Sequence, residues 1–188
     1  MRFLHGSRWL GWVLFGVVVQ AACAHSPVPV PREKVEAEVS RAEVAFGALR
    51  ARLMTRLTTA IADSGLAGAI DVCGTEAQAM ANEIGRANGV TVGRTSFRLR
   101  NHTNAPKPWA KAFVDSAENR PMLFDLGKSV GVLAPIPAGA LCVSCHGPRD
   151  RWVPEVQAVL AKRYPKDEAV NFTEGDLRGY FWAEVPKR

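Results

Sequence analysis

Between residues 32 and 65, apolar residues recur at steps of three and four along the chain. This spacing is that of one face of an α-helix, and it predicts a single long amphipathic helix that ends near Ser64-Gly65. We expect this helix to cover a core, and its outer surface suits pairing with a second copy of the chain as a homodimer. The positions that carry the pattern are Val35, Val39, Ala42, Phe46, Leu49, Leu53, Leu57 and Ile61.

The same spacing continues from Ala67 to Asn88 and predicts a second helix, which Asn88-Gly89 would end. One face of this helix carries Ile70, Cys73, Ala77, Ala81 and Ile84. Cys73 therefore lies on the buried stripe, where a free cysteine most often serves as a small apolar side chain.

Residues 90 to 101 (VTVGRTSFRLRN) change to a period of two, which predicts a strand. One face would carry Thr95, Phe97 and Leu99. The other face would carry Ser96 and three arginines, Arg94, Arg98 and Arg100. Such a face is either exposed to solvent or a clamp for carboxylates, because guanidinium groups bind carboxylates in a two-pronged geometry.

The remaining pattern predicts an antiparallel sheet packed with helices. Two strands joined at Gly127-Lys128 read as a hairpin, and a last aromatic-rich strand closes the chain. Grouped, hairpin-linked strands among helices indicate the α+β class. The expected elements are a loop over 101–108, helices over 109–119 and 154–163, and strands over 122–126, 129–135 and 177–185.

The N-terminus has the features of a secretory signal peptide over residues 1–24. Arg2 and Arg8 precede an uncharged apolar run over residues 9–19, and small alanines follow it. Cys23 at the processing point suits a lipoprotein signal equally well, which would attach the chain to a bacterial membrane. We therefore expect an exported, periplasmic protein with an extended, proline-stiffened tether over 25–31 and one domain over 32–188.

Charge and cysteine content narrow the possible partners and cross-links. The chain has 24 basic and 18 acidic residues, a net charge of +6, and no run of lysines. This distribution predicts no nucleic-acid partner. Of the four cysteines, Cys23 lies at the processing point and Cys142 and Cys145 enclose a very small loop, so a disulfide framework fits poorly.

The stretch LCVSCHG, residues 141 to 147, carries the strongest chemical signal. Two cysteines at this spacing followed by histidine are the attachment motif of c-type haem, in which Cys142 and Cys145 bind the porphyrin and His146 binds the iron. There are two alternatives. One is a zinc site formed by Cys73 together with Cys142, Cys145 and His146, and the other is a redox dithiol in a glycine-bordered loop. For the sixth iron ligand the residues alone favour His102, with Met54, Met80, Met122 and Cys73 as further candidates.

Several motifs together point to a family. VGRTSFRLRN, HTNAP, CVSCHG and GDLRGYFWAEVP resemble a family of exported single-haem c-type proteins with a PAS-like fold, which also occurs as the N-terminal domain of bacterial sensors. The resemblance runs from Val35 to Pro186. It implies a PAS-like antiparallel sheet, one covalent haem, and Cys73 as the distal iron ligand opposite His146.

A haem at this place would also give the arginine-rich segment a role. Arg94, Arg98 and Arg100, with Asn101 and Asn104 behind them, are expected to bind the two propionates. Apolar side chains are expected to wall the ring, namely Phe97, Trp109, Leu133 and Ile136.

The function that follows is redox or small-molecule sensing through an unidentified protein partner. A periplasmic electron carrier is the alternative, since one haem in a small, mildly basic protein suits that role. We do not expect an enzyme, because His102 is the one acid-base candidate near the expected site.

Overall fold

The computed structural model describes residues 27 to 188, and it contains a five-stranded antiparallel sheet. The predicted signal peptide and Cys23 lie outside the described residues. Across the sheet the strands follow the order β1-β3-β4-β5-β2, and each neighbouring pair is antiparallel. This confirms the predicted α+β class with a PAS-like antiparallel sheet. The strands are β1 (Val28–Pro29), β2 (Thr91–Thr95), β3 (Met122–Asp125), β4 (Ser129–Pro137) and β5 (Leu177–Pro186).

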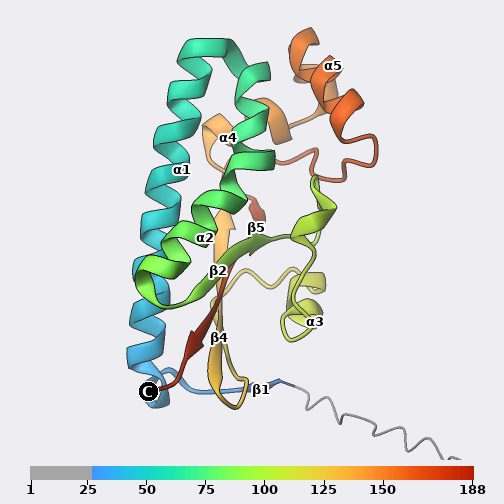
Figure 1. Cartoon of the computed structure of the whole chain (residues 1–188). Coiled ribbons are helices and arrows are strands. Elements are labelled where there is room, and N and C mark those ends of the chain that lie inside the picture. Colours follow the sequence, from blue (N-terminus) through green and yellow to red (C-terminus); the bar gives the residue numbers. More distant parts are fainter. Residues whose placement is uncertain (1–26) are drawn as a thin grey trace, which may run out of the picture.

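Helices cover both faces of the sheet and one of its ends (Figure 1). The long α1 and the shorter α2 lie on one face, α3 lies on the other, and α4 and α5 lie at the end opposite β1 and the C-terminus. No helix in the described part of the chain is long and apolar enough to cross a membrane. The helices are α1 (Glu36–Asp71), α2 (Ala77–Asn88), α3 (Lys111–Asp115), α4 (Ala140–His146) and α5 (Pro154–Arg163).

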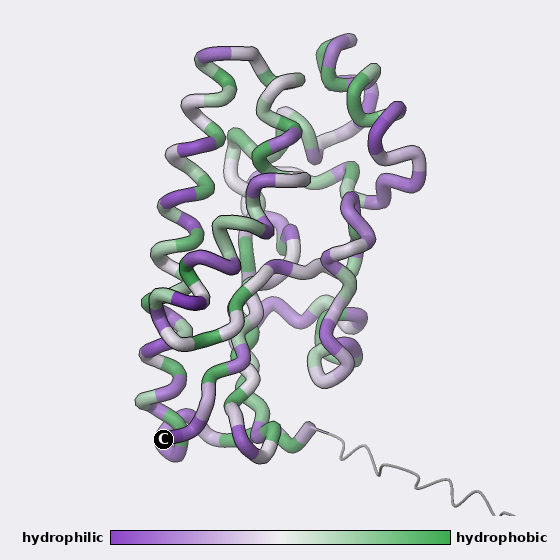
Figure 2. The backbone as a smooth tube through the Cα atoms, in the orientation of Figure 1, coloured by the Kyte–Doolittle hydropathy of each residue, from purple (hydrophilic) through white to green (hydrophobic). Residues whose placement is uncertain are grey.

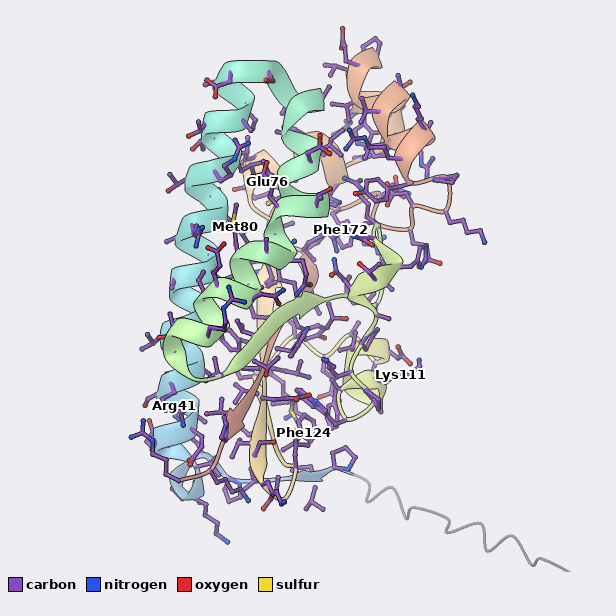
Figure 3. The ribbon with its side chains drawn as sticks, in the orientation of Figure 1. Arg41, Glu76, Met80, Lys111, Phe124 and Phe172 are labelled. Carbon is purple, nitrogen blue, oxygen red and sulfur yellow. The ribbon has the colours of Figure 1, made fainter. Side chains whose placement is uncertain are left out.

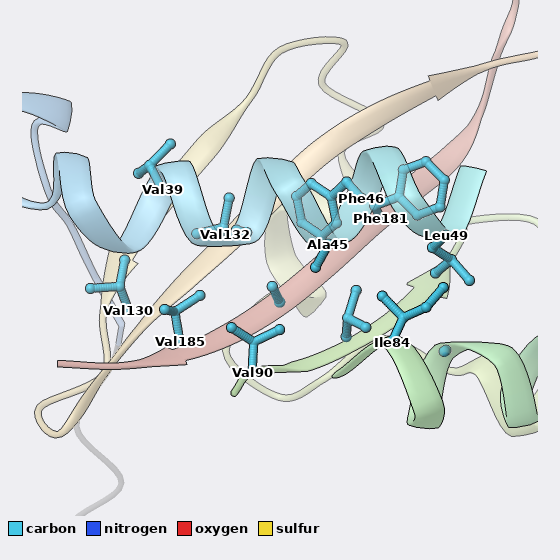
Figure 4. Close-up of a cluster of buried hydrophobic side chains, with 14 of the residues drawn as sticks. Val39, Ala45, Phe46, Leu49, Ile84, Val90, Val130, Val132, Phe181 and Val185 are labelled. Atoms are coloured by element: carbon cyan, nitrogen blue, oxygen red, sulfur yellow. The ribbon is translucent and has the colours of Figure 1, made fainter. Parts of the chain in front are cut away.

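The main core lies between α1, α2 and the sheet. Apolar positions of α1 alternate with polar ones along the helix (Figure 2), and the apolar ones face the strands. Phe46 of α1 stacks on Phe181 of β5 with ring centroids 5.5 Å apart, and Leu49 is fully buried beside them (Figure 4). Burial of each such side chain contributes about 1.5–3 kcal/mol, so this face fixes α1 on the sheet.

A second core lies on the opposite face of the sheet. Phe124, Leu133 and Tyr180 point to this side and pack against α3. Met80 of α2 belongs to the main core, whereas Phe124 belongs to this second one (Figure 3). Trp109 also packs here and donates from Nε1 to the Glu184 carboxylate at 2.8 Å.

The long first helix breaks where the sequence predicts. Gly65 has φ 67° and ψ −176° inside α1, a conformation that glycine adopts without strain. After this break the chain continues through a π-helical turn, Val72–Glu76, which joins α1 to α2. A π-turn inserts one extra residue per turn and often occurs at functional sites.

The arginine-rich segment forms a strand over only half of its predicted length. β2 ends at Thr95, because the side chain of the next residue, Ser96, forms hydrogen bonds to a distant strand and to a nearby amide in place of the ladder. Ser96 Oγ donates to the Arg178 carbonyl at 2.8 Å and accepts from the Arg98 amide at 3.1 Å. The chain then bends into a 3-10 turn, His102–Asn104, so Arg98 and Arg100 do not share one strand face with Arg94.

Part of the predicted tether joins the sheet. Val28 and Pro29 pair with Asp125 and Phe124 as an edge strand, and the Val30 amide donates to the Leu123 carbonyl at 3.0 Å. A second 3-10 turn, Arg32–Lys34, then leads directly into α1.

A candidate cofactor cavity

A cavity of about 470 Å3 lies between α1, the π-helical turn, α4 and one end of the sheet. Its volume is within the roughly 300–1,000 Å3 that is typical of small-molecule and cofactor sites. One wall is apolar, and no carboxylate of the described residues lines the cavity. The apolar lining includes Leu53, Leu57, Ile61, Leu66, Ile70, Leu99, Ile136 and Phe181.

Cys142, Cys145 and His146 reach the cavity from α4. The sequence predicts a loop here, but the motif forms a short helix bordered by Gly139 and Gly147. Residues three apart lie on one face of a helix, so both sulfur atoms are presented to the same side. All three side chains line the cavity. Burial raises the pKa of the Cys145 thiol, although nearby Arg100 opposes this effect.

His146 is oriented by a backbone carbonyl. Its Nδ1 lies 2.8 Å from the oxygen of Ala169, which can only accept a hydrogen bond. Nδ1 therefore carries the proton, and Nε2 keeps a free lone pair for a metal ion. Burial lowers the pKa of His146 well below its ordinary value, and the charges of Arg178, Arg100 and Arg94 lower it further. The imidazole is therefore neutral at neutral pH, as a metal ligand must be.

Behind His146 lies a buried ion pair. Arg100 Nη2 is 2.9 Å from Asp167 Oδ2, with 8% and 3% of the two side chains exposed. The same guanidinium donates to the carbonyls of Cys145 at 2.5 Å and Ala169 at 3.2 Å. Arg100 lines the cavity, but most of its hydrogen bonds hold the backbone on either side of His146 in place.

Cys73 lines the cavity from the π-helical turn. It is partly buried and is not in a disulfide. Arg94 Nη2 donates to the Cys73 carbonyl at 2.9 Å, and Asn101 Nδ2 donates to the Gly74 carbonyl at 3.1 Å. Of the buried stripe predicted from the sequence, Ile70 and Cys73 line the cavity, whereas Ala77, Ala81 and Ile84 pack in the main core.

Two cations without a carboxylate partner lie at the polar wall. Arg94 and Arg178 both line the cavity, and neither forms a salt bridge with a described residue. Burial, with Arg100 and Arg94 nearby, lowers the pKa of Arg178 to about 10, so it stays charged at neutral pH. Burial also lowers the pKa of Arg94. Partly buried cations of this kind are stabilised by an anion, so this wall suits the carboxylate edge of a ligand.

Sequence reasoning missed Arg178 as a site residue. It lies within the GDLRG motif on β5, and its side chain reaches back to Ser96 Oγ at 3.1 Å. The sequence signal that could have identified Arg178 is its place in a motif that follows a glycine turn. Nothing in the period-two pattern of the last strand shows that this end of β5 borders a cavity.

Of the predicted site residues, several line the cavity and four do not. Arg94, Arg100, Asn101 and Asn104 line it together with Cys73, Cys142, Cys145 and His146. Arg98 lies outside: its guanidinium sits 3.6 Å from the Phe172 ring centroid and donates to the Val170 carbonyl at 2.9 Å. Phe97 and Trp109 pack into the core on the other face of the sheet, as does Leu133, whereas Ile136 lines the cavity.

The structure also sorts the candidates for a second axial ligand. His102 is exposed in its 3-10 turn, where Nε2 lies 3.3 Å from the Lys166 carbonyl oxygen. Met80 and Met122 are buried in the two cores. Cys73 and Met54 line the cavity, and Met54 is 41% exposed. The cavity therefore retains Cys73 and Met54 as candidates.

The arrangement gives little support to the two alternatives, a zinc site and a redox dithiol. Within residues 27–188 no three side chains of His, Cys, Asp or Glu gather closely enough to hold one metal ion. The strand neighbours are all antiparallel, whereas a thioredoxin-like dithiol is expected beside a βαβ unit.

The donor set fits a flat, largely apolar group with an anionic edge and a central metal. Two thiols and an imidazole line the cavity from α4, a third thiol lines it from the π-helical turn, and two arginines lie at the polar end. The chemistry of these residues matches the haem c predicted from CxxCH.

Comparison with known proteins agrees with this description. A family model described as Tll0287-like matches residues 24–186. The crystal structure of the cyanobacterial heme-protein Tll0287 aligns with a TM-score of 0.57 and 23% identity, over 85% of this chain and 98% of that chain. At this identity the likeness establishes the fold. None of the curated proteins matches the chain.

Proposed function

Because the chain belongs to the Tll0287-like family, we propose that it is a haem-binding protein, and more specifically an exported one with a single covalent haem c. His146 and Cys73 are its axial iron ligands, and it senses redox state or a small molecule through a protein partner. The heme-protein Tll0287, which shares the fold, supports the choice of cofactor.

One observation carries the proposal. Cys142, Cys145 and His146 on α4 and Cys73 on the π-helical turn line the same cavity. The attachment motif and a second iron ligand thus come from segments about 70 residues apart in sequence, yet they meet at one site.

Each part of the cavity has a role in this assignment. Cys142 and Cys145 would hold the porphyrin through thioether bonds, and His146 would bind the iron through Nε2. Arg94 and Arg178 bind the propionates, while Leu53, Leu57 and Phe181 cover the ring. When bound, the haem supplies an iron that changes oxidation state, and the identity of the axial ligands is a main determinant of its potential.

Sensing is favoured by the element that carries Cys73. A π-helical turn is less regular than an α-helix, and it lies between two helices that cover the sheet. A ligand on such a turn can exchange when the iron is reduced or binds a small molecule, and α1 and α2 would transmit the change to a partner. The lipidated Cys23 would keep the protein at a bacterial membrane if the lipoprotein signal is used.

The test is the mass and optical spectrum of the chain co-expressed with a c-type haem maturation system. We expect the measured mass to equal that of the mature chain plus one haem. The haem should stay attached when the protein is denatured. The double variant Cys142→Ala/Cys145→Ala should lose the covalent haem, while His102→Ala, an exposed neighbour, should keep it. A wild-type chain that leaves the maturation system without haem contradicts the proposal.

An electron carrier is the second candidate, and the exposure of Met54 favours it. Met54 lines the cavity and is 41% exposed. A haem in the cavity would therefore have part of its edge near the surface, where electrons transfer between proteins. The two functions differ in the ferrous state: a carrier keeps both axial ligands, whereas a sensor loses Cys73 on reduction or when carbon monoxide is added. Optical spectra of the reduced protein with and without carbon monoxide distinguish them.

A further inference from the structure

The π-helical turn that carries Cys73 is fastened by side chains from outside the helical layer. The carbonyls of Cys73 and Gly74, two consecutive residues of the turn, accept hydrogen bonds at 2.9 and 3.1 Å. The donors are Arg94 of β2 and Asn101 of the following bend, 21 and 27 residues further along the chain. The turn is thus attached to the sheet at the residue that faces the cavity.

The Asn101 amide is held in the orientation that this contact needs. Its Oδ1 accepts from the Thr103 amide at 3.0 Å and from Thr103 Oγ1 at 2.8 Å. Both Thr103 groups point a hydrogen at this oxygen, so the opposite end of the amide must be the NH2 group. That end meets the Gly74 carbonyl, and the 3-10 turn His102–Asn104 therefore acts as a rigid support for the hydrogen bond.

A third close approach restricts the turn. A Cβ atom at Gly74 would lie 2.0 Å from the Tyr164 hydroxyl oxygen, so the backbone of the turn passes directly against the residue that ends α5. The turn is therefore restricted by the Tyr164 side chain as well as by the two hydrogen-bond donors.

We propose that Asn101 and Arg94 are positioning residues that clasp the Val72–Glu76 turn and thereby hold Cys73 at the cavity wall. Where Cys73 is an iron ligand, which rests on the proposed function, the clasp determines how readily that ligand leaves. Asn101 and Arg94 thus belong to the distal side of the site as well as to its polar lining.

Hydrogen exchange of the full exported chain, produced without haem attachment, tests the clasp itself. Asn101→Asp keeps the oxygen that accepts from Thr103 but loses the NH2 group that donates to Gly74, and Asn101→Ala loses both. His102→Ala is the matched control, because this exposed side chain lies in the same 3-10 turn but contacts the Lys166 carbonyl oxygen and not Asn101 or Gly74. We expect the amides of residues 73–78 to exchange about threefold to tenfold faster in both Asn101 variants, as loss of one net hydrogen bond produces, and near the wild-type rate in the control.

Strands β4 and β5 serve as the internal reference for this experiment. Faster exchange confined to residues 73–78 supports the clasp. Unchanged exchange there in both Asn101 variants overturns it, and so does an equal increase in β4 and β5, because Asn101 would then stabilise the fold as a whole.

The haem-loaded chain provides an independent second readout. The Asn101 variants should show the ferric spectrum of a fraction that has lost its distal ligand, and Arg94→Lys, which keeps a donor and the charge, should retain more of the wild-type spectrum than Arg94→Gln. A ferric spectrum unchanged in every Asn101 and Arg94 variant overturns control of the ligand. If no variant and no wild-type chain binds haem while exchange at 73–78 still responds, the proposed function fails and the clasp stands.

Discussion

At the scale of single residues, the orientation of His146 depends on Ala169 and Asp167, which do not line the cavity. The Ala169 carbonyl accepts from His146 Nδ1 and from Arg100, while Asp167 Oδ1 accepts from the Ala169 amide at 2.9 Å. Asp167 therefore holds both the arginine and the backbone that orient the imidazole. Hydrogen-bond partners of this kind fix the ring of a metal-ligating histidine.

Removing the Asp167 carboxylate should strongly destabilise the chain. Asp167→Ala leaves the Arg100 guanidinium buried without its partner, and breaking one side of a buried pair costs about 3–5 kcal/mol. Urea unfolding measures the loss. Asp115→Ala is the control, because its ion pair with Lys111 has 50% and 65% of the two side chains exposed and should contribute little. Equal midpoints for the two variants would contradict a structural role for Asp167.

Substitutions of Arg178 and Arg98 should differ in their effect on the reduction potential, because only Arg178 faces the cavity. Arg178 lines the cavity and Arg98 packs on Phe172 outside it. A buried cation near the iron favours the reduced form, so Arg178→Gln should lower the reduction potential of the haem-loaded chain. Arg98→Gln should change the potential much less. Spectroelectrochemical titration measures both, and a larger shift for Arg98 would restore the sequence-based assignment.

At the scale of elements, the sequence predicts best where a local signal marks the boundary. The helix over Pro154–Arg163 matches α5 at both ends, because proline occupies its first turn. Gly65 breaks α1 and Gly89, with φ 62°, ends α2 as predicted. These boundaries depend on backbone geometry that single residues impose.

The errors occur where a contact from elsewhere in the chain decides the conformation. The alternation over residues 90–101 continues past Thr95, but Ser96 bonds to Arg178 on β5, and the strand ends. The CxxCH segment is too short to show helical periodicity, and it is held as α4 by contacts such as Arg100 to the Cys145 carbonyl. For the same reason the cavity lining includes Arg178 in place of Arg98.

The crossing of β5 and β2 yields a further prediction. A Cβ at Gly179 would lie 2.3 Å from the Thr95 carbonyl oxygen, a backbone atom that cannot move aside alone. Gly179→Ala should cost roughly 1–3 kcal/mol of stability through overpacking. Gly47→Ala on α1, with nothing within 4 Å, should instead stabilise by about 1 kcal/mol. Thermal unfolding compares them, and a neutral Gly179→Ala would contradict the close approach.

At the scale of the whole molecule, the packed core and the cavity occupy different ends of the same layer. α1 runs the length of the sheet (Figure 1), with Val39, Phe46 and Leu49 in the core near its first half. Further along, Leu53, Leu57 and Ile61 line the cavity. The apolar stripe of α1 thus contributes to the core along its first half and to the cavity lining further along. The sequence pattern is the same in both parts and does not distinguish them.

The central claim is that Cys73 and His146 face one haem iron from opposite sides. The most direct test is the ferric optical and electron paramagnetic resonance spectrum of the haem-loaded wild type beside Cys73→Ala and Met54→Leu. The account predicts a low-spin spectrum of thiolate ligation in the wild type and in Met54→Leu, and its loss in Cys73→Ala. A Cys73→Ala spectrum identical to that of the wild type, or loss of the signal in Met54→Leu alone, would contradict it.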